Sequence, residues 1–488
     1  MNKGLKISLL FIIGVACLYE SGLGIWQLLG SGLNVLPNSI CTGTFSNPGP
    51  YGGFLAVCAC TLGAFSIDKR GAAPIRLFTG VCAITALMVL PSTQSRAAIL
   101  SLFCSALPAL VRNPQCRNIL KKYWIVLSIL VVVLMAFAYN FKKPSADGRF
   151  FMDKICIKAM YDNGWKGVGL GNFGGAYGKA QHDYFKEQIE TNGKEEFDWM
   201  SLNEHGRLTA DSPLYAFNEY LSIGVEAGLF AMLLFMGLVS AAIAISFKRD
   251  TDWWYGLTAF AVFAFFSFPL HVRELQTLFL ILIASCMLDA PPTDRSRLYY
   301  AGVVVVIVSF VTLGTVCVMK YPELKNHRRL ESEWKRTEAL YRVECYECVA
   351  ERGQELLPFM KNDRHFLFAY GQSLNKTGYY ELSDSILELG TLVSADPMFW
   401  NVMGNNSMFL GKYREAEARY KYAFHMLPNR LYPLNLLAKL YYTEGDTAKF
   451  MDMANKVESF KPKIESANTE RLRKEIRDLR EVMFLIKQ

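Results

Sequence analysis

Two arginines beside apolar segments have side chains suited to binding a phosphate. Arg96 follows Ser95 where an apolar segment begins, and Arg149 follows Gly148 in a polar stretch after another apolar segment. The planar guanidinium group binds phosphate oxygens in a bidentate way that the lysine ammonium group does not match. An arginine at the mouth of a membrane helix also commonly extends its charge into the lipid headgroups. We therefore expect Arg96 either to bind a phosphate or to anchor its helix at the membrane surface.

Three further motifs combine glycine with polar side chains: GTFSNP at 43–48, GVGLGNF at 167–173 and FNEYLSIGVEAGL at 217–229. Residues 169–174 formally match the dinucleotide-binding pattern G-x-G-x-x-G. No strand–turn–helix unit is predicted around them, so a flexible loop is the better interpretation.

Two pairs of residues resemble metal ligands by spacing alone. Asp250 and Asp252 have the spacing of the metal-binding pair of sugar-nucleotide transferases, but two tryptophans follow them, and we expect them to cap an interfacial helix. Cys345 and Cys348 lie one helical turn apart with no further ligand nearby, so we expect buried thiols or a local disulfide. We predict no metal site and no cofactor.

The composition places these motifs in a membrane protein. The chain has 488 residues, of which 52% are hydrophobic and 13% aromatic, more than an ordinary soluble domain contains. Apolar segments of about 15 to 25 residues recur through the first two thirds, which is the length that a bilayer requires. We predict nine spans, at roughly 5–29, 51–66, 76–91, 96–111, 123–141, 214–247, 254–270, 275–289 and 298–319.

Basic residues in the short loops orient these spans. With nine spans counted from a cytoplasmic N-terminus, the basic loops all face the cytoplasm, as membrane proteins prefer. The net charge of +8 therefore does not indicate nucleic-acid binding. Loops 30–50, 92–95, 142–213 and 271–274, and everything after Met319, then face the periplasm, and an uncleaved first span is preferred to a signal peptide. The basic residues are Lys3, Lys6, Lys69, Arg70, Arg76, Arg112, Arg117, Lys121, Lys122, Lys248, Arg249, Arg295 and Arg297.

The C-terminal third has the pattern of a helical repeat. Gly378, Gly411 and Gly445 recur at the spacing of tetratricopeptide repeats, and residues 397–428 match one full unit. We predict an all-α protein with a transmembrane helical bundle at 1–320 and a soluble tetratricopeptide-type domain at 324–488. Such arrays bind peptides or partner helices in a concave groove. A rigid spacer or a subunit contact is an equally good interpretation.

GTFSNP, Ser95-Arg96, Gly148-Arg149, GVGLGNF and FNEYLSIGVEAGL occur together, in this order, in a known family. Over about residues 20–290 the chain resembles the O-antigen ligases and polymerases, a family that includes the bacterial O-linked oligosaccharyltransferases. The repeat tail resembles that of Bacteroides-type members. This resemblance implies a metal-independent glycosyltransferase of the bacterial inner membrane. It would take a glycan from a polyprenyl-diphosphate donor and place it on a lipid A core sugar, a growing chain or a protein hydroxyl.

The resemblance also implies roles for individual residues. Arg96 and Arg149 would grip the diphosphate and stabilise the charge that develops on the leaving group. The amphipathic segment 150–161 would lie along the membrane–water interface, in contact with lipid. The residues expected to contribute to substrate binding are Asn47, Ser95, Asn172, Asn218 and Glu226.

The chain departs from the family pattern in two ways. Family members often carry a histidine just before the asparagine of the 217–229 motif, whereas Tyr215 and Phe217 stand before Asn218 here. Family members also carry further spans before GTFSNP, which implies either a late start site or a bundle that lacks helices and whose activity is in doubt. The candidates to replace the missing base are Glu219, Glu226, Asp211, His182, His205 and His271, of which we favour Glu219 and His271.

Two other functions remain as alternatives to the transferase. A non-catalytic scaffold would use the spans only to anchor the repeats within a cell-surface glycan assembly system. A transporter is less favoured, because few charged residues lie inside the spans. A protein partner on the repeats would favour protein glycosylation, and lipid ligation stays open.

Overall fold

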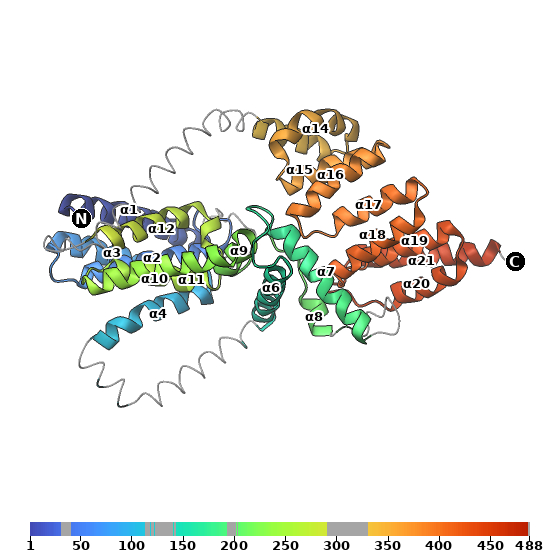
Figure 1. Ribbon diagram of the computed structural model, residues 1–488. Helices are drawn as coiled ribbons and strands as arrows, with labels where there is room; N and C mark the ends of the chain where they lie inside the picture. Colours follow the sequence, from blue (N-terminus) through green and yellow to red (C-terminus); the bar gives the residue numbers. More distant parts are fainter. Residues whose placement is uncertain are drawn as a thin grey trace. The chain divides into compact units, whose positions relative to one another are not determined.

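A computed structural model describes residues 1–30, 41–112, 118, 122, 140, 143–192, 202, 204–289 and 330–486. Every regular element in these ranges is a helix (Figure 1), which confirms the predicted all-α class. The chain divides into two compact units. The bundle unit contains residues 1–143, 216–223 and 230–318, and the hairpin unit contains residues 144–215, 224–229 and 319–488. The predicted domain boundary at 320–324 lies outside the described residues.

The bundle unit is built from apolar helices. Within the described part of the chain, four helices are long and apolar enough to cross a membrane, namely Lys3–Leu28, Pro48–Ile67, Ala73–Thr93 and Leu229–Lys248. The predicted spans at 123–141 and 298–319 fall almost wholly outside the described residues. The elements of this unit are α1 (Lys3–Leu28), α2 (Pro48–Ile67), α3 (Ala73–Val89), η1 (Leu90–Thr93), α4 (Arg96–Arg112), α10 (Leu229–Lys248), α11 (Trp253–Ala264), η3 (Pro269–His271) and α12 (Arg273–Leu288).

One predicted span proves to be two helices. The segment 214–247 divides into α9 (Glu219–Ala227) and α10, with Gly228 between them at φ +92°. This backbone conformation is in the left-handed region, which glycine adopts without strain and which ends a right-handed helix. The break was missed because the segment is apolar on both sides of the glycine.

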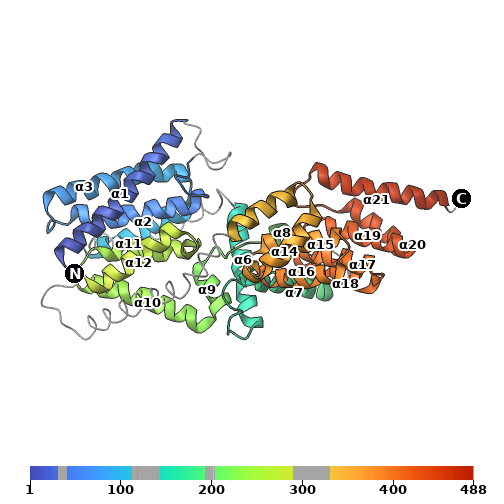
Figure 2. The same cartoon turned by 90° about the horizontal axis from the view of Figure 1, so that it is seen from above.

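Contacts between α2 and α11 define the two ends of the bundle unit. Near the start of α2, a side-chain carbon on Gly53 would meet the ring of Phe263, at the end of α11. Near the end of α2, the ring centroid of Phe65 lies 4.8 Å from that of Trp253, at the start of α11. The two helices are therefore antiparallel. Helix α2 lies beside α3 and α11 in Figures 1 and 2, and it also packs against α4. We call the end at the start of α2 the Asn47 end and the opposite one the Asp289 end.

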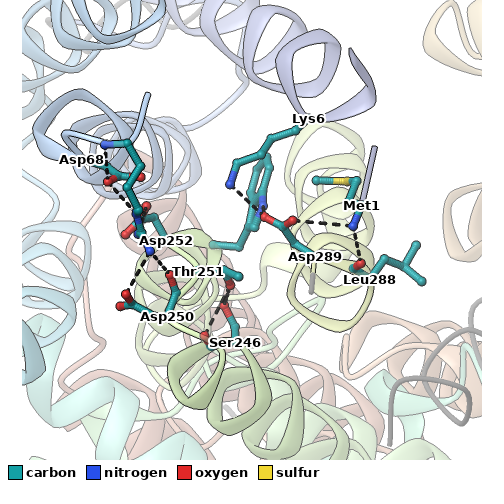
Figure 3. A network of polar contacts seen from close by, with 11 residues as sticks. Met1, Lys6, Asp68, Ser246, Asp250, Thr251, Asp252, Leu288 and Asp289 are labelled. Atoms are coloured by element: carbon teal, nitrogen blue, oxygen red, sulfur yellow. Dashed lines mark hydrogen bonds and ion pairs between the residues drawn. The ribbon is translucent and has the colours of Figure 1, made fainter. Parts of the chain in front are cut away.

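Ion pairs and hydrogen bonds connect several helices at the Asp289 end (Figure 3). Lys6 Nζ and Trp253 Nε1 donate to Asp289 Oδ2 at 2.9 and 3.0 Å, which joins α1, α11 and α12. Arg70 pairs with the carboxylates of Asp68 and Asp250 at 2.8 and 2.9 Å. Loops that were predicted to share one face of the membrane therefore meet at one end of the bundle.

The role expected for Asp252 needs correction. It occupies the N-cap position of α11, but its side chain makes no capping hydrogen bond. Instead its carboxyl lies 3.3 Å from Arg70 Nη2 and shares a hydrogen bond with Asp68. Burial, together with the neighbouring Asp68 carboxylate, raises the pKa of Asp252 to about 7.

The hairpin unit contains antiparallel helix pairs that pack on one another in chain order. Gly378, Gly411 and Gly445 form the turns inside three successive pairs, with φ values of 86°, 71° and 80°. The pairs are α15 (Arg364–Lys376) with α16 (Tyr380–Val393), α17 (Met398–Phe409) with α18 (Tyr413–Met426), and α19 (Tyr432–Glu444) with α20 (Thr447–Ser459); α14 (Tyr346–Met360) precedes them and α21 (Ala467–Ile486) follows them.

Packing inside the pairs repeats with the same period. In the first pair, a side-chain carbon on Gly371 would meet Leu387. In the second pair, a side-chain carbon on Gly404 would meet the ring of Tyr420, and both residues follow their counterparts in the first pair by the same interval. Glycine on the first helix thus admits a large side chain from the second helix at equivalent places. The described helices agree with the predicted spacing, and the tetratricopeptide class stays a prediction.

The long segment before α9 belongs to the hairpin unit as well. It forms α6 (Lys143–Asp162), α7 (Phe173–Asn192) and α8 (Glu204–Thr209), and α7 packs against α16 and α18.

Candidate functional site

The starts of α2 and α4 adjoin each other at the Asn47 end. Asn47 caps α2 by accepting a hydrogen bond from Gly49 N at 2.8 Å, and Ser95 Oγ donates to Gly49 O at 3.5 Å. Arg96 is half-buried and is the first residue of α4. A helix N-terminus carries a positive dipole, which favours anions. In the first turn of α2, Pro48 and Pro50 have no N–H and Gly49 N is bonded to Asn47, so only the dipole contributes there. GTFSNP and the Ser95-Arg96 step therefore meet around two helix N-termini.

Two polar side chains of α1 hold the turn that leads into α2. Glu20 accepts hydrogen bonds from Thr44 N at 3.0 Å and Thr44 Oγ1 at 2.6 Å. Gln27 accepts from the backbone N–H groups of Thr42 and Gly43, both at 2.9 Å, and donates to Gly43 O. The sequence interpretation missed both residues. The available signal was the presence of a carboxylate and an amide inside an apolar segment, where polar groups need partners.

The two favoured base candidates prove to be neighbours. Glu219, the first residue of α9, is 1% exposed, and its Oε1 lies 3.4 Å from Nδ1 of His271. Its other oxygen accepts a hydrogen bond from Leu270 N at 2.9 Å, while the His271 side chain is partly exposed. A buried carboxylate beside an accessible imidazole can orient the ring as a general base.

This pair lies at the same end of the bundle unit as Asn47. Tyr220, next to Glu219, donates to Ala261 O at 2.9 Å near the end of α11. That end of α11 is also where Phe263 packs on Gly53 of α2. Asn218 accepts from Leu221 N at 3.3 Å and so caps α9.

The GVGLGNF motif is held by the end of α9 within the hairpin unit. Val168 N donates to Val225 O at 3.0 Å, and Gly171 N donates to the Glu226 carboxylate at 3.0 Å. Asn172 Nδ2 donates to Val168 O at 2.9 Å and closes the loop. Asn172 and Glu226, predicted to bind substrate, thus organise the loop itself. Two of the five motifs meet here.

Arg149 lies in α6 and is half-buried. It belongs to the hairpin unit, whereas Arg96 belongs to the bundle unit. The disulfide expected as one alternative for Cys345 and Cys348 is present.

The remaining base candidates have other surroundings. His182 stacks on Tyr422 with ring centroids 3.8 Å apart, and burial lowers the pKa of its imidazole. Asp211 is largely exposed and lies 3.8 Å from Lys463 Nζ. The side chain of His205 lies outside the described residues. In the described ranges, no group of three or more histidine, cysteine or acidic side chains is arranged to hold a metal ion.

These observations define an all-α membrane protein whose bundle unit has two helix N-termini, an arginine and a carboxylate–imidazole pair at one end. Residues 81–236 match the family model for O-antigen ligase, which confirms the predicted resemblance to that family over this segment. The matched segment includes Arg96, Arg149 and Glu219 and does not include Asn47, His271 or the C-terminal helices. It supports glycan transfer of the O-antigen ligase or polymerase type. No curated protein sequence matches the chain.

Proposed function

We propose that this protein transfers a glycan from a polyprenyl-diphosphate-linked donor to an acceptor hydroxyl at the periplasmic face of the bacterial inner membrane. The observation that carries the proposal is the presence of Arg96 and the Glu219–His271 pair at one end of the same unit. That arrangement provides one site for an anion and one for a proton, which are the two needs of this reaction.

In the proposed mechanism, the donor diphosphate binds where α2 and α4 begin. The guanidinium of Arg96 contacts its oxygens, and the positive ends of the two helix dipoles attract its negative charge. Arg149 of α6 is proposed as the second guanidinium on the ground of the family resemblance, and no relative placement of the two units enters this proposal. As the bond between the anomeric carbon and the diphosphate oxygen breaks, negative charge grows on the leaving group, and fixed positive groups stabilise it most in the transition state.

His271 accepts the proton of the acceptor hydroxyl in this mechanism. The hydroxyl oxygen then forms the new bond to the anomeric carbon, and polyprenyl diphosphate leaves. Glu219 acts through His271, because its buried carboxylate orients the ring and stabilises the imidazolium that forms. The proton finally passes to water or to the departing diphosphate.

Substitution of the arginines tests the proposal. We expect Arg96→Ala and Arg149→Ala to lower transfer at least about 100-fold, since the loss of one charge-stabilising group commonly costs that much. Membrane insertion, measured by fractionation and protease accessibility, stays unchanged.

The matched control is Arg96→Lys. A lysine still extends its charge into the headgroups but lacks the planar fork, so we expect a loss of at least about tenfold if Arg96 binds the diphosphate. Full transfer in Arg96→Lys would indicate a headgroup anchor. Full transfer in both alanine variants would refute the diphosphate site.

A further inference from the structure

The segment 144–215 and the C-terminal helix pairs share one hydrophobic core. Phe185 and Ile189 of α7 and Ala210 are buried in the same cluster as side chains of α18 and α19, among them Tyr420 and Leu437. Burial of apolar surface is the main favourable contribution to folding. The segment is therefore built into the helix pairs.

Three glycines of α7 form the tightest part of this contact. Gly174, Gly175 and Gly178 lie at positions i, i+1 and i+4, on one face of the helix. A side-chain carbon at each of them would come within 3.0 Å of backbone atoms in residues 391–395. Backbone cannot move aside as a flexible side chain can, so only glycine permits this approach. The contact explains why glycine occupies positions 174, 175 and 178 of the GGAYG sequence.

Buried polar side chains fix the register of the contact. Gln181, which is fully buried, donates to Met426 O at 2.6 Å and to Asp211 O at 3.1 Å. Arg207, also buried, donates to Lys461 O at 2.8 Å, and Asn429 donates to Ala210 O at 2.8 Å. Asn429 and the acceptors Met426 and Lys461 lie where α18 and α20 end. Because an unpaired buried polar group is costly, these bonds favour one arrangement.

Helix α7, which these contacts hold in place, packs against α6. The ring centroid of Phe151 lies 5.6 Å from that of Tyr184 and 5.7 Å from that of Phe185. Lys158 Nζ lies 2.9 Å from Glu187 Oε1. Arg149 is close to Phe151 on α6, so its position depends on α7.

We propose that the C-terminal helix pairs are a platform that positions Arg149 for glycan transfer. The helix pairs contact the chain's own segment 144–215. The sequence had left open a groove for peptides or partner helices, a rigid spacer and a subunit contact. The inference rests on the proposed function of Arg149. Residues Gly175, Gln181 and Arg207 are positioning residues, because they act through α7 and α6.

The test compares Gly175→Ala with Gly206→Ala in the full-length protein. The two substitutions are chemically identical and lie in helices of the same segment, but a side-chain carbon on Gly206 meets nothing within 4 Å. Amide hydrogen exchange over α7 reports docking, and the turnover number per inserted molecule reports transfer. We expect Gly175→Ala to lower protection of α7 and turnover at least about tenfold each, and Gly206→Ala to leave both unchanged.

A double-mutant cycle separates positioning from general damage. Arg149→Lys is combined with Gly175→Ala, and with Gln181→Leu as a second undocking variant. If docking acts through Arg149, the turnover number of each double variant is no more than about threefold below that of its less active single variant. The reason is that substitution of Arg149 has little further effect once the residue is already misplaced.

Three outcomes would overturn the inference. In the first, the turnover losses of the single variants multiply in both double-mutant cycles. In the second, turnover is unchanged although α7 has lost its protection. In the third, protection of α7 is unchanged in both Gly175→Ala and Gln181→Leu. If the unmodified chain transfers no glycan, the proposed function fails and this inference fails with it. If α7 loses hydrogen-exchange protection while glycan transfer is unchanged, the platform inference is refuted and the proposed function still stands.

Discussion

The bundle unit and the hairpin unit are both helical, yet their described surfaces differ in the side chains that they expose. On α1, α3 and α10 large apolar side chains point outward, and Phe230, for example, is 80% exposed. Apolar surface on this scale is stable only when lipid or protein covers it. The hairpin unit also exposes large apolar side chains, such as Ile464 at 74%, but they stand beside many charged pairs one turn apart, such as Lys456 with Asp452 at 2.8 Å.

The two units also place their buried polar groups differently. In the bundle unit, Glu20 bonds a turn at one end and Asp289 bonds Lys6 at the other, so these charged side chains make their contacts where helices end. In the hairpin unit a polar network runs through the interior, where Asn406 accepts from Asn375 and donates to Asp384, both at 2.6 Å. Helix ends in a membrane reach water and headgroups, whereas the interior network sets the register of neighbouring pairs.

This contrast predicts that site residues of the bundle unit affect activity and not folding. We expect His271→Ala to lower transfer by about 100-fold or more, since a positioned general base contributes roughly 10²–10⁴ in rate. Glu219→Gln should give a smaller loss, because it removes only the orientation and charge next to the ring. The melting temperature of His271→Ala should stay within about 2 °C of the unmodified protein, since the ring is partly exposed. Full transfer by His271→Ala would remove it from the mechanism.

In the hairpin unit, we predict that substitution of a glycine packed between two helices lowers the folding stability. Gly404→Ala places a methyl group against the ring of Tyr420, and we expect it to destabilise the helix pairs by about 1–3 kcal/mol. The control is Gly237→Ala in α10, where a side-chain carbon meets nothing within 4 Å and alanine favours a helix by about 0.8–1 kcal/mol. Thermal unfolding followed by circular dichroism measures both. Equal effects would mean that the helix pairs are not tightly packed.

The smallest effect concerns pH at the Asp289 end. Because the pKa of Asp252 is raised to about 7, the folded protein holds a proton between about pH 4 and 7 that the unfolded chain lacks. Stability therefore falls as pH rises through this range, and we expect a melting temperature roughly 2–4 °C lower at pH 8 than at pH 5.5. Asp252→Asn should reduce this difference in thermal unfolding. A difference of the same size in that variant would assign it to other groups.

Local patterns were the part of the fold that the sequence predicted best. Apolar segments of bilayer length identified α1, α2, α3 and α10, and the spacing of Gly378, Gly411 and Gly445 identified the turns of the helix pairs. The break at Gly228 escaped this approach, because a glycine inside an apolar segment is compatible with either a continuous or a broken helix. Asp252 was misjudged because its partner Arg70 is distant in sequence.

The candidate site, like the fold, was predicted only in part from the sequence. The residue types alone indicated that Arg96, Arg149, Glu219 and His271 deserved testing, since each has chemistry suited to a phosphate or a proton. Only the tertiary structure brought Glu219 next to His271, which is distant in sequence, and packed α7 onto the C-terminal helix pairs. Periodicity and composition are properties of neighbouring residues, so the sequence by itself determined the helices and the membrane character of this protein. The packing of helices that are distant in sequence determines which helix ends meet. Only the tertiary structure could therefore show which residues of the candidate site are neighbours.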